Sequence, residues 1–540
     1  MTRNKISLLM LGAAAVLASC SDIDNQNPEG DIITSDQIKE TNEAIPSRTD
    51  AVFSGMFSMM GEPFSVYGSK QGRADDFGYV MMAFSQDVEG ADVVVQNSGY
   101  NWFSACADMT TRDPSYANPY TRYKHPYNQI GVANEVLASV EEGSNKWAQA
   151  KAMRAFAYMQ LAPYFQFGYT GHKDEPCIPI LSEGVDYTNN PRATMAEVYD
   201  AILTDLNDAI GALQQNPTTR GTDKTRIDIN VAYGLRARAH LAIGEYAKAA
   251  DDAAKAMEGY TPASINEIST PTFTDMAEHN WMWAIDITDD MVAEDGYPTS
   301  CSWVGSFSGS SYSAGTGCYA CCNVMLYNKI PATDVRKGWW VDENLKSPLL
   351  EGLSWNEARG QDIATYEYDD KVAFLPYTNV KFGMKSGIGS AVNNNDWPLM
   401  RVEEMILIQA EGLAKSGNES QARTVLENFV KTYRDPAYTV NGRQLSLADE
   451  IWFQRRVELW GEGFYVADMK RLGKPLVRFH QGEVNNWPEA YQFNMAADDP
   501  WLNMRFTQTE MNNNKAIVDN TGGTLPVAGQ NGQLRDGVTD

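Results

Sequence analysis

Apolar and small side chains recur every three or four positions in residues 228–260, which is the spacing of one face of an α-helix. Gly244 interrupts this pattern, and a second face of the same kind begins after it. The positions before the interruption are Ala232, Leu235, Ala239 and Ala242, and those after it are Tyr246, Ala249, Ala253 and Ala256. Small residues on both faces let two helices approach closely, so the segment predicts a tightly packed helical hairpin.

Other parts of the chain repeat this pattern. A second hairpin is predicted in residues 401–430, where Gly417 and Asn418 separate two apolar faces. Residues 147–168 and 198–213 add two alanine-rich helices. The length of these units and their order of small and large residues resemble the tetratricopeptide repeat, whose hairpins stack into a right-handed solenoid. The predicted fold class is therefore mainly α, a solenoid of tetratricopeptide-like hairpins.

A long segment without helical periodicity separates these hairpins. Residues 261–397 are rich in Gly, Ser, Asn and aromatic residues, and residues 280–288 alternate for a few positions as a short strand does. Irregular segments carried on a rigid scaffold commonly form binding surfaces. We therefore expect a helical region at 51–260, a loop-rich insert with a few short strands and the ligand face at 261–397, and a C-terminal helical hairpin and tail at 398–540.

The N-terminus has the layout of a secretory signal. Basic residues precede an apolar run over residues 6–17, which is too short to span a bilayer as a permanent helix. Residues 17–20, Leu-Ala-Ser-Cys, resemble the lipobox of bacterial lipoproteins, in which cleavage leaves an acylated cysteine at the new N-terminus. Residues 1–19 are thus predicted to be a lipoprotein signal peptide, Cys20 the lipidated residue, and 20–50 the anchor and a polar tether. The alternative is an ordinary signal peptide in which this cysteine is incidental.

Charge and composition argue against several classes of function. With 44 basic and 70 acidic residues the chain has a net charge of −26, so it lacks the basic footprint of a nucleic-acid-binding protein. Seven cysteines in 540 residues are not a disulfide scaffold, and no histidine lies near the cluster of Cys318, Cys321 and Cys322. Incidental or paired cysteines are expected there rather than a metal site. Five histidines in the whole chain favour neither zinc nor histidine-based catalysis, and we expect no cofactor.

Residues 451–473, IWFQRRVELWGEGFYVADMKRLG, carry the most specific motif of the chain. The segment resembles the C-terminal signature of the SusD/RagB family of outer-membrane nutrient-uptake lipoproteins. The matching positions are Ile451, Arg455, Arg456, Glu458, Leu459, Glu462, Gly463, Asp468, Arg471 and Gly473. Gln454, Phe464 and Met469 depart from the residues that are commoner in the family. Further pieces agree in the same order along nearly the whole mature chain, among them YNQIGVANEVL, MRAFAYMQLAPYFQFG, EVYDAILTDLNDAI, WMWAI and TDVRKGWW.

The signature itself is predicted to be structural. Arg455, Glu458 and Glu462 recur at intervals of three and four, which places them on one face of a helix. Among the neighbouring tryptophans they would form a partly buried ion network, which is costly to break by removing one partner. We therefore expect these residues to hold the fold rather than to bind a ligand.

The resemblance implies a function at a membrane surface. Proteins of this family capture glycans, and in some members peptides, and pass them to a SusC-like TonB-dependent transporter barrel over which they sit as a lid. The resemblance thus implies a lipid (palmitate) anchor in the outer membrane, exposure at the cell surface, a glycan ligand, the transporter as partner and no catalysis. Asp22 and Asp24 are similar to surface-export signals on lipoproteins of the Bacteroidetes type. A peptide ligand, a scaffold that binds only proteins, and a glycoside hydrolase remain as alternatives.

Aromatic residues with polar neighbours are the candidates for ligand contact, because the apolar face of a sugar ring stacks on an exposed aromatic ring beside hydrogen-bonding groups. Trp303, Tyr312 and Tyr319 lie among Gly and Ser residues that cannot bury them. Asn101 and Trp102 place an amide beside a large ring, at about the point where family members contribute ligand contacts. Burial in the core is the alternative for these aromatic rings.

Two further groups of residues have competing structural interpretations. Residues 281–355 hold six of the 13 tryptophans, of which Trp283 at least is expected in the core. Asp87, Glu89 and Asp92 would suit sugar hydroxyls or calcium, although a solvated acidic loop is the commoner arrangement.

Overall fold

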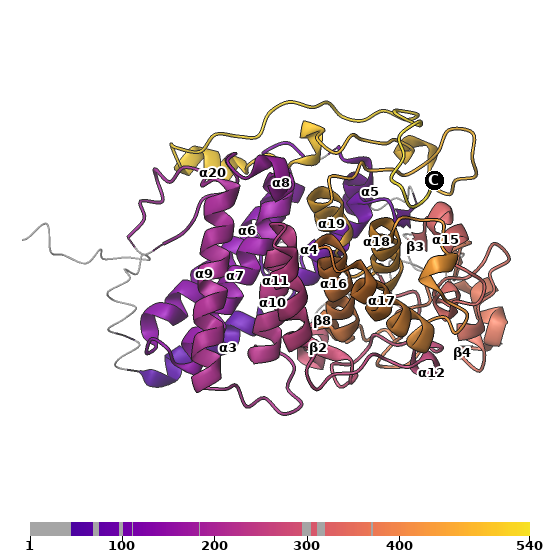
Figure 1. Cartoon of the computed structure of the whole chain (residues 1–540), viewed down its shortest axis with the longest axis horizontal. Coiled ribbons are helices and arrows are strands. Elements are labelled where there is room, and N and C mark those ends of the chain that lie inside the picture. The colour runs from indigo at the N-terminus through magenta and orange to yellow at the C-terminus, as the bar shows by residue number, and fades with distance from the viewer. Residues whose placement is uncertain are drawn as a thin grey trace, which may run out of the picture. The chain divides into compact units, whose positions relative to one another are not determined.

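A computed structural model of the chain describes residue 41 and residues 45–68, 75–96, 101–110, 112–182, 184–293, 304–309, 319–368 and 371–540. The chain divides into two units, Met1–Val52 and Phe53–Asp540, and the architecture that follows is that of the second. Long helices dominate this unit and lie side by side over much of its length (Figure 1).

The described helices and strands follow in chain order. The helices are α3 (Pro46–Ser58), α4 (Gly78–Glu89), α5 (Asn101–Asp108), α6 (Ala117–Ser139), α7 (Asn145–Phe165), α8 (Tyr169–His172), α9 (Met195–Gln215), α10 (Ile229–Ala242), α11 (Tyr246–Ala256), α12 (Ile265–Ile268), α13 (Asp289–Ala293), α15 (Val324–Lys329), α16 (Val402–Lys415), α17 (Glu419–Tyr433), α18 (Leu447–Glu458), α19 (Tyr465–Arg471) and α20 (Gln508–Asn513). The strands are β1 (Val93–Val95), β2 (Trp281–Ile285), β3 (Ala320–Cys322), β4 (Ser354–Trp355), β5 (Ala358–Arg359), β6 (Glu367–Tyr368), β7 (Lys371–Val372) and β8 (Trp397–Arg401). Short 3-10 helices are η3 (Val335–Trp339), η4 (Pro348–Leu350), η5 (Gly360–Thr365), η6 (Val440–Gly442), η7 (Glu489–Tyr491) and η8 (Pro500–Leu502).

The long helices form a continuous stack. α6 packs on α7, α7 on α9, α9 on α10 and α10 on α11. α11 then packs on α16, which packs on α17 and α18, although the whole insert separates α11 from α16 in the sequence. This order confirms the mainly helical fold class, and both predicted hairpins are present as α10–α11 and α16–α17.

Local chemistry sets the ends of these helices and their spacing. Asp228 caps the first turn of α10 through its side chain. Gly244 and Gly417 form the two hairpin turns with left-handed φ angles of 82° and 90°. α11 and α16 approach each other closely at Gly412 of α16, where a Cβ atom would stand 2.5 Å from the carbonyl oxygen of Tyr246 on α11. The small residues that predicted a tight hairpin therefore also allow neighbouring hairpins to pack together.

The insert contains short two-stranded antiparallel sheets. Its first and last named strands, β2 and β8, pair with each other, which closes the insert at its base. β3 pairs with β1 from the N-terminal helical region, and β4–β5 and β6–β7 are short local pairs. The strand predicted within residues 280–288 is confirmed as β2.

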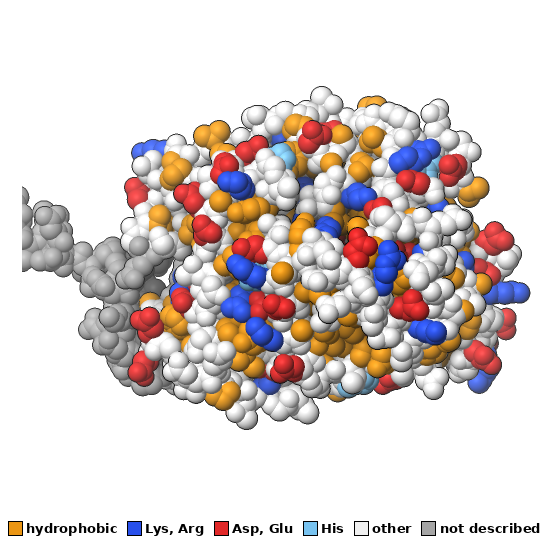
Figure 2. All heavy atoms as spheres, viewed as in Figure 1, with side chains coloured by type: hydrophobic (Ala, Val, Ile, Leu, Met, Phe, Trp, Pro, Cys, Tyr) orange, Lys and Arg blue, Asp and Glu red, His pale blue; other side chains and the backbone are white. Residues whose placement is uncertain are grey.

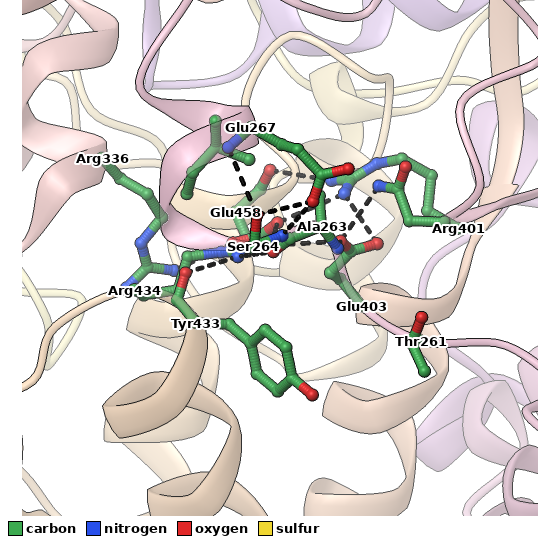
Figure 3. A network of polar contacts seen from close by, with 12 residues as sticks. Thr261, Ala263, Ser264, Glu267, Arg336, Arg401, Glu403, Tyr433, Arg434 and Glu458 are labelled. Atoms are coloured by element: carbon green, nitrogen blue, oxygen red, sulfur yellow. Dashed lines mark hydrogen bonds and ion pairs between the residues drawn. The ribbon is translucent and has the colours of Figure 1, made fainter.

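A buried ion network joins the insert to the helices (Figure 3). Glu458, the last residue of α18, is fully buried. It accepts hydrogen bonds from Arg336 at 3.2 Å, from Arg401 at 3.2 Å and from Arg434 at 2.7 Å. These arginines come from η3, from β8 and from the end of α17. Burial alone would raise the pKa of Glu458, but the three guanidinium groups outweigh burial and hold this pKa well below its usual range.

A buried lysine extends this network further into the insert. Lys381 donates from Nζ to the carboxylate of Glu462 at 2.7 Å and to the carbonyl oxygens of Glu458 at 3.0 Å and Trp460 at 2.8 Å. Arg401 binds the other carboxylate oxygen of Glu462 at 2.8 Å. Burial lowers the pKa of Lys381 to about 8. Glu458 and Glu462 of the signature thus pair with lysine and arginine side chains that lie outside the signature.

The predicted ion network exists, but its geometry differs from the prediction. α18 ends at Glu458, and Gly461, with a φ of 79°, turns the chain so that Glu462 lies beyond the helix. Arg455 pairs with Asp468 of α19 instead, with Nε 2.8 Å from Oδ2. The prediction of a single helix face was wrong because helical spacing does not continue past this turn. The network is also fully rather than partly buried.

Asp87, Glu89 and Asp92 do not form a solvated loop. The first two lie in α4 and the third just after it, and each is 3% exposed. Glu89 pairs with Arg122 at 2.6 Å, and Asp92 pairs with Arg456 at 2.7 Å. Both interpretations from the sequence were therefore wrong, because Glu89 and Asp92 are paired with arginines from other parts of the fold and Asp87 is buried as well.

Asp87 differs from its two neighbours because it accepts only neutral donors among its described contacts. The backbone N–H groups of Gly463 and Tyr465 donate to its carboxylate at 2.8 and 3.1 Å. Burial raises the pKa of Asp87 to about 7, and the two hydrogen bonds offset only part of this effect.

We expect Glu458→Gln to lower the free energy of unfolding by about 3–5 kcal/mol, because it leaves buried arginines without their common carboxylate. Urea unfolding monitored by tryptophan fluorescence measures the change. Glu419→Gln is the matched control, since Glu419 is 67% exposed and 3.8 Å from Arg423, and it should leave stability nearly unchanged. Equal effects of the two substitutions would show that the network contributes nothing beyond a surface ion pair.

The raised pKa of Asp87 predicts a pH dependence of stability. The folded protein keeps a proton on Asp87 that the unfolded chain releases as the pH rises above about 4, so this group lowers the free energy of unfolding between pH 4 and about 7. Asp87→Asn removes this titration, and its stability relative to the wild type should rise across that window. Denaturation at a series of pH values measures the difference, with Asp251→Asn, at an exposed site on α11, as the control. A difference that stays constant with pH would contradict the prediction.

Candidate ligand-binding site

Most of the ligand-binding residues predicted from the sequence fall outside the described residues. Trp303 and Tyr312 lie outside them altogether. The backbone of Asn101 and Trp102 forms the first turn of α5, while their side chains are outside the description. These four residues remain predictions.

Tyr319 is described, and it is buried. Its side chain is 5% exposed, and its hydroxyl donates to the carbonyl oxygen of Val372 at 2.5 Å. The prediction that Gly and Ser neighbours leave this ring exposed was wrong. Tyr319 directly precedes β3, and the pairing of β3 with β1 draws the segment into the interior.

The tryptophans of the insert form part of the core. Five of the six between residues 281 and 355 are described, and each is at most 1% exposed: Trp281, Trp283, Trp339, Trp340 and Trp355. The rings of Trp339 and Trp340 lie with centroids 6.2 Å apart, and Trp340 meets Trp460 of the signature edge to face at 5.4 Å. The local enrichment in tryptophan therefore reflects packing of the insert against the helices.

The described cysteines do not form a metal site. Cys106, Cys177, Cys321 and Cys322 are buried free thiols. Burial raises the pKa of Cys321 to about 12, so this thiol is an inert packing group. Within the residues that the structure describes, no three His, Cys, Asp or Glu side chains are placed to hold a metal ion together.

A surface hollow of about 380 Å³ lies at the start of α6, and we call it the tyrosine hollow. It is lined by Tyr67, Pro114, Ser115, Tyr116, Ala117, Tyr120, Gln508 and Thr509. The volume falls within the range of small-molecule sites. The lining residues come from three distant segments: the turns after α3, the entry to α6 and the start of α20.

The start of α6 presents two of the rings on one side. Tyr116 precedes the first helical residue and Tyr120 follows one turn later, so the two side chains lie on the same face. Tyr116 is 46% exposed. The Lys124 ammonium group donates to the hydroxyl of Tyr120 at 3.0 Å and lies 5.3 Å from its ring centroid. These contacts restrict the ring of Tyr120, while the ring of Tyr116 stays open to solvent.

The third ring is positioned by a buried carboxylate. Asp76 accepts hydrogen bonds from the backbone N–H of Val66 at 3.1 Å and of Tyr67 at 2.7 Å. This turn places the Tyr67 ring 5.3 Å from that of Tyr120, centroid to centroid, with the ring planes tilted by 38°. A hydrogen bond joins the start of α20 to the segment before α6: the backbone N–H of Gln508 donates to the carbonyl oxygen of Pro114 at 3.0 Å.

The chemistry of the tyrosine hollow suits a neutral polyhydroxylated ligand. None of its lining residues is charged at neutral pH. Three phenol rings offer apolar faces, and Ser115, Gln508 and Thr509 offer hydroxyl and amide groups at the rim. The sequence contains one sign of this site, the closely spaced tyrosines of PSYANPYTRY (residues 114–123). The rest of the tyrosine hollow could not be predicted, because Tyr67 and Gln508 are far from these tyrosines in the sequence and meet them only in the folded protein.

Two sequence-family models match the chain. A family described as "Starch-binding associating with outer membrane" matches residues 72–241, and the SusD family matches residues 355–528. No protein of curated function matches the chain in sequence. Among the described residues, no helix is both long and apolar enough to cross a membrane.

Several solved structures share this fold. A SusD-like carbohydrate binding protein from Bacteroides vulgatus is 23% identical with a TM-score of 0.69, over 87% of this chain and 97% of its own. Surface glycan-binding protein A from Bacteroides thetaiotaomicron, solved in complex with laminarihexaose, is 17% identical with a TM-score of 0.61, over 88% and 99%. A laminarin binding SusD-like protein is 17% identical with a TM-score of 0.57, over the same shares.

The two family models cover the N-terminal helices and the C-terminal signature, and the solved structures share the fold that connects them. At these identities the structural likeness concerns the fold alone. Together with the signature residues and the family models, it confirms the resemblance found in the sequence: the chain belongs to the SusD/RagB family.

Proposed function

We propose that this protein is a non-catalytic surface lipoprotein that captures glycans and delivers them to a SusC-like TonB-dependent outer-membrane transporter. The observation that carries the proposal is the tyrosine hollow, where three rings and several neutral polar groups converge in a volume of about 380 Å³. Stacking of sugar rings on the phenols supplies affinity, and the rim hydroxyl and amide groups orient the ligand. The family description and the solved laminarihexaose complex of a structural neighbour support a glycan as the ligand.

Binding without catalysis agrees with the chemistry of this site. A glycosidase needs two carboxyl groups on either side of the scissile bond. The described lining of the tyrosine hollow contains no carboxylate and no histidine. The buried carboxylates Glu89, Asp92 and Glu458 are each held by arginines in the interior. A peptide is the second candidate ligand, since tyrosine rings and amides also bind peptide chains.

Delivery to a transporter requires that the protein stay attached to the membrane while it moves. Cys20 is proposed as the lipidated residue, and residues 20–50 as the tether. Two or more acyl chains hold a folded domain on a membrane stably, whereas one chain does not. The binding body would then act as a lid over the transporter on the outer face of the outer membrane.

Tyr116→Ala and Tyr120→Ala should each weaken glycan binding about tenfold, because loss of one stacking surface removes about 1.4 kcal/mol. Affinity electrophoresis against a panel of soluble polysaccharides, followed by calorimetry with the best ligand, measures the change. Tyr187→Ala is the matched control, since Tyr187 is 62% exposed and lies outside the hollow.

Other variants decide whether the hollow is the site. If Trp102→Ala or Trp303→Ala abolishes binding and both hollow variants bind normally, the ligand lies at the residues predicted from the sequence instead. If only peptides bind, and the hollow variants weaken that binding, the ligand is a peptide and the tyrosine hollow is still its site. Hydrolysis of the bound glycan by purified protein would contradict a purely binding function.

Cys20→Ser should release the protein from the membrane, because it removes the proposed acylation site. Cell fractionation with radiolabelled palmitate is the measurement: we expect label and outer-membrane association in the wild type and neither in the variant. Cys106→Ser is the control, since Cys106 is a buried free thiol. Palmitate on the Cys20→Ser protein would contradict the anchor assignment.

A further inference from the structure

A second cavity, of about 100 Å³, lies where the helical stack meets the signature segment, and we call it the central cavity. Its walls come from α4, α7, α9, α10, α16, α18 and α19. Figure 2 shows a hollow in this part of the surface, near the place where Figure 1 draws α19 above α11 and α16. The central cavity and the tyrosine hollow share no described lining residue.

Two residues that line the central cavity each carry a buried polar atom without a hydrogen-bond partner in the described part of the chain. The atoms are Nη1 of Arg455, whose residue is 3% exposed, and Oε1 of Gln86, whose residue is 2% exposed. Arg455 uses its other nitrogens on Asp468, at 2.8 and 3.2 Å. Buried polar groups are normally paired. One donor and one acceptor therefore remain for a molecule that occupies the cavity.

The charges around the central cavity are already matched. Arg238 binds both carboxylate oxygens of Glu404, at 2.7 and 2.6 Å. Arg471 binds both oxygens of Glu411, at 2.6 and 2.8 Å. Because each guanidinium group has its own carboxylate, an anion would gain little net attraction here. A hydroxyl compound both donates and accepts hydrogen bonds, so it can satisfy both unpaired atoms without adding charge.

The remaining wall is apolar and aromatic. The ring of Phe464 lies under the Arg238 guanidinium group, 5.3 Å from its centroid. Tyr199 of α9 and Leu241 of α10 add an aromatic and an aliphatic surface. Apolar walls with a few convergent polar groups are typical of sites for small ligands.

We infer that the central cavity binds one small neutral polyol, of the size of a single sugar unit or less, through Nη1 of Arg455 and Oε1 of Gln86. Helices surround the cavity on several sides, so the ligand is a free small molecule rather than a segment of a polymer. The inference is independent of the proposed glycan capture, which uses the tyrosine hollow.

Calorimetric titration of the mature protein with glucose, galactose and glycerol, and with inorganic phosphate as the anionic probe, tests the inference. We expect the wild type to bind at least one polyol. Ala467→Phe, which fills the cavity from α19, should weaken that binding at least tenfold. Ala254→Phe, on α11 away from the cavity, and Tyr116→Ala, in the tyrosine hollow, should leave it unchanged.

Arg455→Lys is the second variant, and it carries the test if Ala467→Phe does not fold. It keeps a positive charge for Asp468 but removes Nη1, so polyol affinity should fall at least tenfold, and circular dichroism shows whether the variant keeps its fold. Three results would overturn the inference: no binding of any of the three polyols, binding of phosphate alone, or polyol affinity that is the same in both variants as in the wild type. If Tyr116→Ala loses glycan binding but still binds the polyol, the central cavity and the tyrosine hollow are two separate sites.

Discussion

One buried carboxylate, that of Glu458, holds together parts of the protein that are far apart in the sequence. Its three arginine partners belong to the insert, to the strand that closes the insert and to the end of α17. Removing a cation from water costs several kcal/mol, so each arginine is tolerated in the interior only because a carboxylate meets it there. Docking of the insert and packing of α17 and α18 therefore stabilise each other, which links the two halves of the fold.

This constraint explains why the most specific motif of the chain is a motif of the interior. The signature supplies Glu458, Glu462 and Arg455 to ion pairs, and it supplies Gly463 where α4 comes closest. A Cβ atom at Gly463 would stand 2.6 Å from the Cα of Ala83, so no larger residue fits without moving α4. A segment constrained in this way has little freedom to adapt to different ligands.

The sequence predicted what depends on local spacing and missed what depends on distant partners. The hairpins α10–α11 and α16–α17 follow from periodicity and turn glycines within about 35 residues. Asp87, Glu89 and Asp92 looked like a solvated loop because their partners are hundreds of residues away or, for Glu89, on another helix. The tyrosine hollow was missed for the same reason, since the turns after α3, the entry to α6 and the start of α20 meet only in the folded protein.

The two hollows differ in how the scaffold supports them. The tyrosine hollow lies at helix ends and turns, where Tyr116 can remain 46% exposed because no ion pair or core contact requires it to be buried. The central cavity is lined instead by members of the interior charge pairs, among them Arg238 and Arg455, whose side chains are fixed by their carboxylates. An open array of rings tolerates ligands of different length and linkage. A rigid cavity with one free donor and one free acceptor discriminates by size and by hydrogen bonding, because a ligand that fails to reach either atom leaves a buried polar group unpaired.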